Sequence, residues 1–178
     1  MRPVGQRSLT ERMKGAALLK VDVYEEVEAD PTATNQAAIV VGIAALAAAI
    51  GGAGAGAGAS GFLSGIVATY LGWALWSGLT YLIGDKLLGG TATWGELLRT
   101  IGFAQAPRVL LLFAFIPGLG ALIALVVAVW LLITGVVAIR QALDFSTGKA
   151  ILTAVLGWIA AVLVGVVLGA FSRAVSPF

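Results

Sequence analysis

The chain has 178 residues, of which 60% are hydrophobic and only 11% are charged, whereas a typical soluble domain has about 45–50% apolar and about 25% charged residues. A water-soluble fold of this size could not bury so much apolar surface, so that class is excluded. The chain has no cysteine and no histidine, which excludes disulfides, thiolate or imidazole metal sites and the common nucleophile–base pairs. We expect no cofactor, and the scattered basic residues predict no nucleic-acid partner.

Residues 1–36 are predicted to form a short cytoplasmic segment of two amphipathic helices, because this part of the chain is rich in charge. Ser8 and Glu11 fit a capping box at the start of the first helix, and Asp22 with Glu25 could begin the second. The segment either lies on the membrane surface or packs on the cytoplasmic end of a helix bundle.

The rest of the chain is predicted to be all-α and polytopic, with five transmembrane helices in one bundle at 37–172 and a short outer tail at 173–178. Asp30-Pro31 is a good start for the first helix, since Asp can cap it and Pro is favoured in its first turn. A signal peptide is the alternative for this run, but its apolar part would begin late, behind acidic residues. A glycine-rich connection follows at 51–61. The predicted spans are about 31–50, 62–83, 94–116, 119–139 and 150–171.

Helix rise decides the boundaries of the third and fourth spans. The apolar run 109–139 would extend roughly 46 Å as an α-helix, which is too long for one crossing of about 30 Å and too short for two. Two crossings therefore need residues upstream, with Pro117 and Gly118 in the outer turn. Pro107 then lies inside the third helix and must kink or break it.

Five crossings place the two termini on opposite sides of the membrane. Most lysines and arginines fall in the segments that share a side with the N-terminus, so the positive-inside rule predicts a multi-pass protein of the cell membrane with the N-terminus cytoplasmic and the C-terminus outside.

The predicted break in the third span is the main candidate functional element. Arg108 lies far from either end of the span, where it should meet an acid, carbonyls freed beside Pro107, or a wet crevice that Gln105 could share. The alternative is that Arg108 snorkels from a tilted helix to the membrane interface and has no functional role. The candidate residues are Gly102, Phe103, Gln105, Pro107 and Arg108.

Two charged pairs at the cytoplasmic ends of helices are predicted to be interfacial ion pairs rather than a proton relay. Glu96 and Arg99 are three residues apart, and Arg140 and Asp144 are four apart, so each pair can form within one helix.

Small residues recur every four positions in the last span, which lets helix backbones approach closely in lipid. Such a ridge serves either packing inside the bundle or dimerisation. Three tryptophans near mid-span, Trp73, Trp76 and Trp130, are expected in the core or lining a cavity. The ridge consists of Gly157, Ala161, Gly165 and Gly169.

Several segments together resemble a prokaryotic member of the Yip1 family. They are the acidic stretch 23–31, the Thr-Trp-Gly-Glu-Leu-Leu-Arg run at 93–99, Gly-Phe-Ala-Gln-Ala-Pro at 102–107, and the stretch 138–145 with Lys149-Ala150. The element at 102–107 is similar to the family's Gly-Tyr-x-x-x-Pro, with Phe103 in place of Tyr. The eukaryotic Asp-Leu-Tyr-Gly-Pro element is absent. The resemblance implies five spans, a cytoplasmic N-terminus and no established catalysis; eukaryotic relatives associate with prenylated Rab-type GTPases and with one another.

These observations favour a non-enzymatic membrane adaptor or membrane-organising protein. Its expected partners are the lipid bilayer and other membrane proteins or a second copy of the chain. The alternative is a small transporter or channel component with a polar site at the broken third helix. A membrane enzyme is a third class, limited to carboxylate chemistry by Asp85, Glu96 and Asp144.

Overall fold

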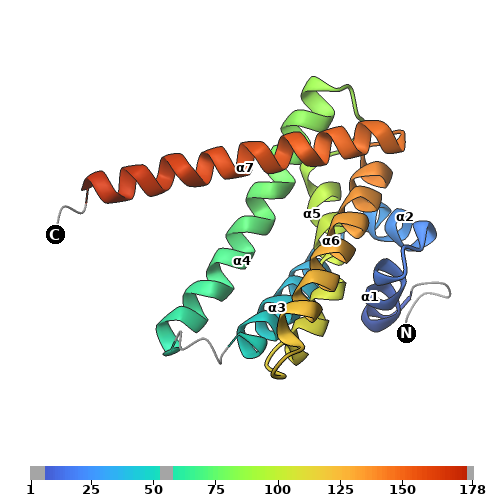
Figure 1. Ribbon diagram of the computed structural model, residues 1–178. Coiled ribbons are helices and arrows are strands. Elements are labelled where there is room, and N and C mark those ends of the chain that lie inside the picture. Colours follow the sequence, from blue (N-terminus) through green and yellow to red (C-terminus); the bar gives the residue numbers. More distant parts are fainter. Residues whose placement is uncertain (1–6, 53–57, 176–178) are drawn as a thin grey trace.

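The computed structural model describes residues 7–52 and 58–175, and within these ranges it contains helices and no strands (Figure 1). The predicted all-α class is confirmed. Part of the predicted glycine-rich connection, 53–57, and the end of the predicted outer tail, 176–178, lie outside the described residues. The elements are α1 Leu9–Ala17, α2 Val21–Ala29, α3 Ala33–Gly51, α4 Gly58–Tyr81, the π-helix η2 Leu82–Leu87, α5 Trp94–Ala104, the 3₁₀-helix η3 Ala106–Phe113, α6 Gly120–Ala142 and α7 Thr147–Val175.

Four of the predicted spans are present as continuous helices long and apolar enough to cross a membrane. They are α3, the run Gly61–Leu87 formed by α4 and η2, α6, and the Thr147–Val166 part of α7. The predicted third span, 94–116, is not one continuous helix: α5 ends at Ala104 and η3 follows. Pro107 explains this, because it has no N–H and its ring would collide with the carbonyl four residues earlier in an α-helix.

The two pieces of the interrupted element together remain long enough to cross a bilayer. The 11 residues of α5 extend about 16 Å and the 8 residues of η3 about 16 Å, since a 3₁₀-helix rises about 2.0 Å per residue. The sum matches a hydrocarbon core of about 30 Å. Both α3 and α6 pack against η3.

The centre of the molecule is built where α3 and α5 approach each other closely. A Cβ placed on Gly102 would lie 2.7 Å from Cβ of Ala37 on α3 and 3.3 Å from the Trp73 ring on α4. The absence of a side chain at Gly102 therefore permits the contact between three helices. Around it, Leu97, Phe103 and Ile139 are fully buried and belong to a single apolar cluster.

The N-terminal helices α1 and α2 pack against the bundle instead of lying apart from it. Tyr24 is fully buried, and its hydroxyl donates to the carbonyl of Ala16 at 3.0 Å. Trp130 of α6 donates to the carbonyl of Ala17 at 2.8 Å. The predicted capping box of Ser8 and Glu11 is present. The segment therefore packs on the bundle, and α2 shares the central apolar cluster.

One arginine joins the first three helices. Arg12 of α1 is 1% exposed and donates to Glu26 of α2 at 3.0 Å, to Asp30 at 2.9 Å and to Gln36 of α3 at 2.9 Å. Asp30 Oδ1 accepts from the Thr32 N–H at 3.0 Å, as a capping aspartate does, and α3 begins after this turn, at Ala33.

The helices α4 and α7 are splayed relative to this core (Figure 1). Two hydrogen bonds hold α4: the Tyr70 hydroxyl donates to the carbonyl of Ala38 on α3 at 2.9 Å, and the Trp73 indole donates to the carbonyl of Leu98 on α5 at 3.0 Å. α7 contacts α4, η2 and α6 near its beginning, and its second half extends away from the other helices.

Candidate functional site

The candidate site lies where α5 gives way to η3, inside the predicted third span. α5 begins with a capping box in which Glu96 Oε2 accepts from the Thr93 N–H at 2.7 Å and Thr93 Oγ1 accepts from the Glu96 N–H at 3.3 Å. At the other end of α5, Phe103 and Pro107 are buried, as is Gly102. The five candidate residues therefore surround one interruption in the backbone.

A threonine on a neighbouring helix satisfies one carbonyl at the interruption. Thr134 of α6 is fully buried, and its Oγ1 lies 2.9 Å from the oxygen of Ala104, the last residue of α5. The η3 turn begins with the Arg108 N–H donating to the carbonyl of Gln105 at 2.9 Å. An unpaired carbonyl is costly in hydrocarbon, so Thr134 stabilises the break.

Two side-chain groups beside the break have no hydrogen-bond partner within the described residues. They are Oε1 of Gln105 and Nε of Arg108, and both atoms are buried. Of the arrangements considered for Arg108, a pairing with an acid is wrong for the part of the chain that the structure describes, because no ion pair includes it there.

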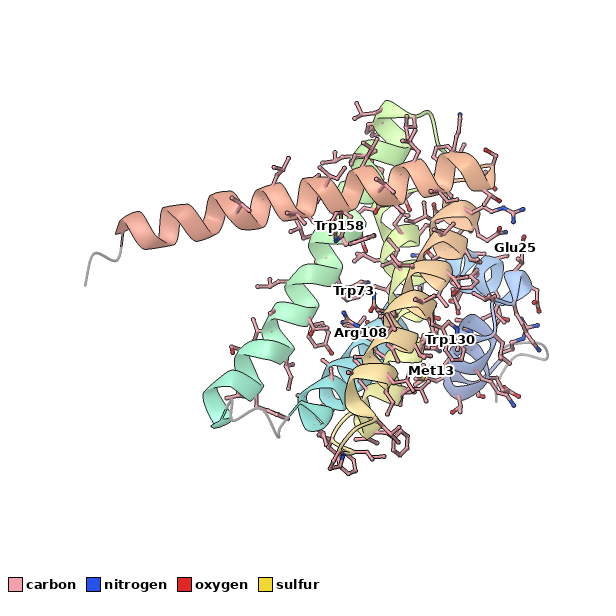
Figure 2. All side chains as sticks on the ribbon, viewed as in Figure 1. Met13, Glu25, Trp73, Arg108, Trp130 and Trp158 are labelled. Carbon is pink, nitrogen blue, oxygen red and sulfur yellow. The ribbon has the colours of Figure 1, made fainter. Side chains whose placement is uncertain are left out.

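Arg108 instead lies between two adjoining crevices bounded by α3, α4 and η3. The larger crevice has a volume of about 520 Å³ and the smaller one about 350 Å³; Thr69 and Arg108 line both. Gln105, Trp73 and Trp76 line the smaller crevice. Figure 2 shows Arg108 and Trp73 in the space between α4 and the helices of the core. The arrangement can hold a ligand with an acceptor for the guanidinium and apolar parts for the walls.

Two of the three tryptophans considered for core or cavity serve both purposes. Trp73 and Trp76 pack against the central cluster and also line the smaller crevice. Trp130 faces the other way and donates to α1 (Figure 2).

The charged residues predicted to form ion pairs within single helices connect different elements instead. Arg99 Nε donates to the carbonyls of Val27 at 3.0 Å and Glu28 at 3.1 Å, which places its charge at the C-terminus of α2. Within the described ranges, Glu96 and Arg99 form no ion pair with each other. Instead of pairing with each other, Glu96 caps the beginning of α5 and Arg99 binds the carbonyls at the end of α2.

The second predicted pair is also separated. Asp144 Oδ2 accepts from Thr91 Oγ1 at 2.9 Å, and Arg140 is exposed. Asp144 has a left-handed backbone, with φ of 54°, so it has left the helix that was expected to align it with Arg140. The helix ends at Ala142, with Leu143 as its cap.

Acidic side chains gather around Glu28 at this end of the molecule. Partial burial, with the charges of Glu96 and Asp144 as the next causes, raises the pKa of Glu28 to about 7. The Arg99 guanidinium acts in the opposite sense, and Glu25 adds to the rise. No group of three or more carboxylates is placed to hold a metal in the ranges 7–52 and 58–175. Asp85 lies apart from this group and pairs with Lys86 at 2.8 Å.

The small-residue ridge of α7 is only partly in contact with the bundle. Gly157 is buried, and a Cβ built on it would lie 3.7 Å from Oγ1 of Thr80 on α4. Gly165 is exposed and has nothing near its Cβ position, Ala161 is intermediate, and the surroundings of Gly169 are not described. Internal packing therefore uses the beginning of the ridge.

The sequence did not single out Arg12 or Thr134. The partners of Arg12 are 14 to 24 residues away, so no helical spacing indicates the network. A polar residue in a strongly apolar span was the available signal for Thr134.

The fold and this site define a multi-pass helical membrane protein. The family model described as "Yip1 domain" matches residues 20–169, so the chain belongs to the Yip1 family, as its sequence motifs predicted. No curated protein and no solved structure matches the chain.

Proposed function

We propose that this protein is a non-enzymatic membrane adaptor or membrane-organising protein that binds other membrane proteins or lipids through the surfaces of its helices. The observation that carries the proposal is the second half of α7, which stands away from the bundle (Figure 1). Leu163 and Val166 are 59% and 63% exposed there. A helix with an uncovered apolar face beside small residues is suited to packing against a helix of another protein or against lipid chains.

Site-specific photo-crosslinking in native membranes tests this proposal. A photoreactive residue at Val162, which flanks Ala161 and Gly165, should give a discrete protein adduct. The matched control is Val129 on α6, which is also exposed and should give lipid adducts only. Equal yields of protein adducts at the two positions, or none at Val162, would contradict a protein partner on α7.

We further propose that the chain crosses the membrane five times, with the N-terminus in the cytoplasm and the C-terminus outside. The combined length of α5 and η3 and their packing against α3 and α6 support a fifth crossing. The excess of basic residues in the cytoplasmic segments supports the orientation.

The crevice around Arg108 favours the second candidate, a small transporter or channel component. Polar groups beside an interrupted helix at mid-depth often line transport sites. Flux of ions and small anions into proteoliposomes separates the two candidates. The adaptor predicts no flux above that of protein-free vesicles, whereas flux abolished by Arg108→Gln would favour the transporter.

A further inference from the structure

The strongest unexplained feature outside the helix surfaces is the cationic crevice at Arg108. The guanidinium has five N–H donors and remains charged in proteins. No hydrogen bond or ion pair of this side chain forms within the described ranges, and its Nε is buried. An unneutralised charge that is buried in a membrane protein is costly.

The elements around the crevice contain no acid of their own. The stretch 31–84, which includes α3 and α4, has no Asp or Glu, and neither does 97–143, which includes η3 and α6. The chain therefore supplies no counter-ion on any segment that could reach Arg108 from the walls of the crevice. An anion from outside the chain would provide it.

The walls indicate what kind of anion fits. On both sides of Arg108 they consist mainly of small or apolar residues, with Thr69 as the shared polar one. Gly65 and Gly72, one in each crevice, are exposed, so both crevices can be reached from outside the molecule. Volumes of about 520 and 350 Å³ suit part of a chain-like ligand rather than a bare ion.

We propose that this crevice binds an anionic amphiphile, with its oxyanion head on Arg108 and Gln105 and its hydrocarbon chain along the α3–α4 wall. The head is a lipid phosphate or a fatty-acid carboxylate, since both accept two hydrogen bonds from a guanidinium. On Gln105 only the NH2 group can donate to this head, since its buried Oε1 is an acceptor. This inference rests on the proposed lipid-binding function and gives that function a binding site. A protein that organises membranes through lipids needs a site that distinguishes one lipid from another.

Retention of lipids by the purified full chain, measured by native mass spectrometry, tests the head group. The probes are phosphatidylglycerol, phosphatidylcholine, oleate and inorganic phosphate. The wild-type protein should retain one phosphatidylglycerol or oleate at least tenfold more strongly than phosphatidylcholine, and the comparison of the first two identifies the source of the oxyanion. Arg108→Gln should remove this preference. Arg140→Gln, at the exposed arginine of α6, should leave it unchanged.

Substitutions that fill the crevices test where the hydrocarbon chain of the ligand binds, and they leave Arg108 unchanged. The Cβ positions of Gly65 and Gly72 have no atom within 4 Å, so leucine can be accommodated at either and would occupy the crevice. Gly65→Leu or Gly72→Leu should lower retention at least tenfold, and which of them does so shows where the hydrocarbon chain lies. Gly148→Leu is the control, because its Cβ position also has free space and it lies outside both crevices.

Three results would overturn the proposal: equal retention of phosphatidylglycerol and phosphatidylcholine, unchanged retention in both crevice-filling variants, or binding of inorganic phosphate with no amphiphile. The variants Gly65→Leu and Gly72→Leu leave Arg108 in place. They therefore test the proposal even if Arg108→Gln fails to fold. The crosslinking at Val162 is independent, so the loss of a protein partner on α7 and the loss of this lipid site are distinguishable.

Discussion

Arg12 shows at the scale of one residue how the water-exposed part of the chain is attached to the bundle. Its single guanidinium binds groups on or after α2 and on α3, and it is almost completely buried. A lysine could not replace it, because the ammonium lacks the planar fork that reaches Glu26, Asp30 and Gln36 together.

Arg12→Met should therefore destabilise the protein by about 3 kcal/mol, because it removes the buried cation that Glu26 and Asp30 share and leaves Glu26 with Arg7 alone. Arg12→Lys should recover little of this loss. Thermal unfolding in detergent measures it, with Lys14→Met on the exposed face of α1 as the control. Equal melting temperatures for the Arg12 and Lys14 variants would show that the network does not contribute.

Glu28 gives a pH-dependent prediction at the same scale. Its pKa is about 7 in the folded protein, against 4.5 for an unperturbed glutamate, so the folded form binds the proton more tightly than the unfolded form. The resulting destabilisation is absent below about pH 4.5, grows as the pH rises, and is complete above about pH 7. The groups facing Glu28 are Glu96, Asp144 and Glu25, opposed by Arg99.

Glu28→Gln should accordingly raise the melting temperature at pH 8 and leave it nearly unchanged at pH 4.5. The two measurements on one pair of proteins control for effects of the substitution itself. A gain of the same size at both pH values would rule out titration of Glu28 as the cause.

At the scale of elements, the sequence predicts the long apolar helices well and their ends less well. The break at Pro107 follows from the chemistry of proline, but the change to a 3₁₀-helix that continues to Phe113 does not. The π-helix that extends α4 past the predicted end of the second span was also not expected. Such details depend on which neighbours pack against the backbone, and a single helical pattern does not contain that information.

The close contact between α3 and η3 predicts that a side chain at Gly51 destabilises the fold. A Cβ on Gly51 would lie 1.8 Å from the carbonyl oxygen of Leu111, so even alanine requires the backbone to move. Gly51→Ala should destabilise the fold by about 1–3 kcal/mol. Gly65→Ala is the control, because no atom lies within 4 Å and alanine is the better helix former. Melting temperatures in detergent compare the two, and a tolerated Gly51→Ala would contradict the close packing.

At the scale of the whole molecule, the candidate site was predictable in part. Arg108, Gln105 and the proline break were identified from the apolar span around them, and a crevice was one of the arrangements considered. The two ion pairs predicted within single helices do not form among the described residues. Arg99 binds the end of α2 instead, and Asp144 accepts a hydrogen bond from a threonine. Long-range partners such as these are set by helix packing.

Whether α6 crosses the membrane can be measured directly, because the chain has no native cysteine. Leu119→Cys, before α6, should react with a membrane-impermeant maleimide from outside intact cells. Ser146→Cys, before α7, should react only after permeabilisation, since α6 separates the two positions by one crossing. Both sites are exposed in the structure. Labelling of both positions from one side would contradict α6 as a span.

The attachment of α2 has a consequence for communication across the membrane surface. Arg99 of α5 donates to the last carbonyls of α2. Arg12 binds both Asp30, which follows α2, and Gln36 near the start of α3. A soluble factor that pulled α2 outward would have to detach both arginines and expose Tyr24. A displacement of α2 is therefore coupled to α3 and α5 through the hydrogen bonds of these two arginines.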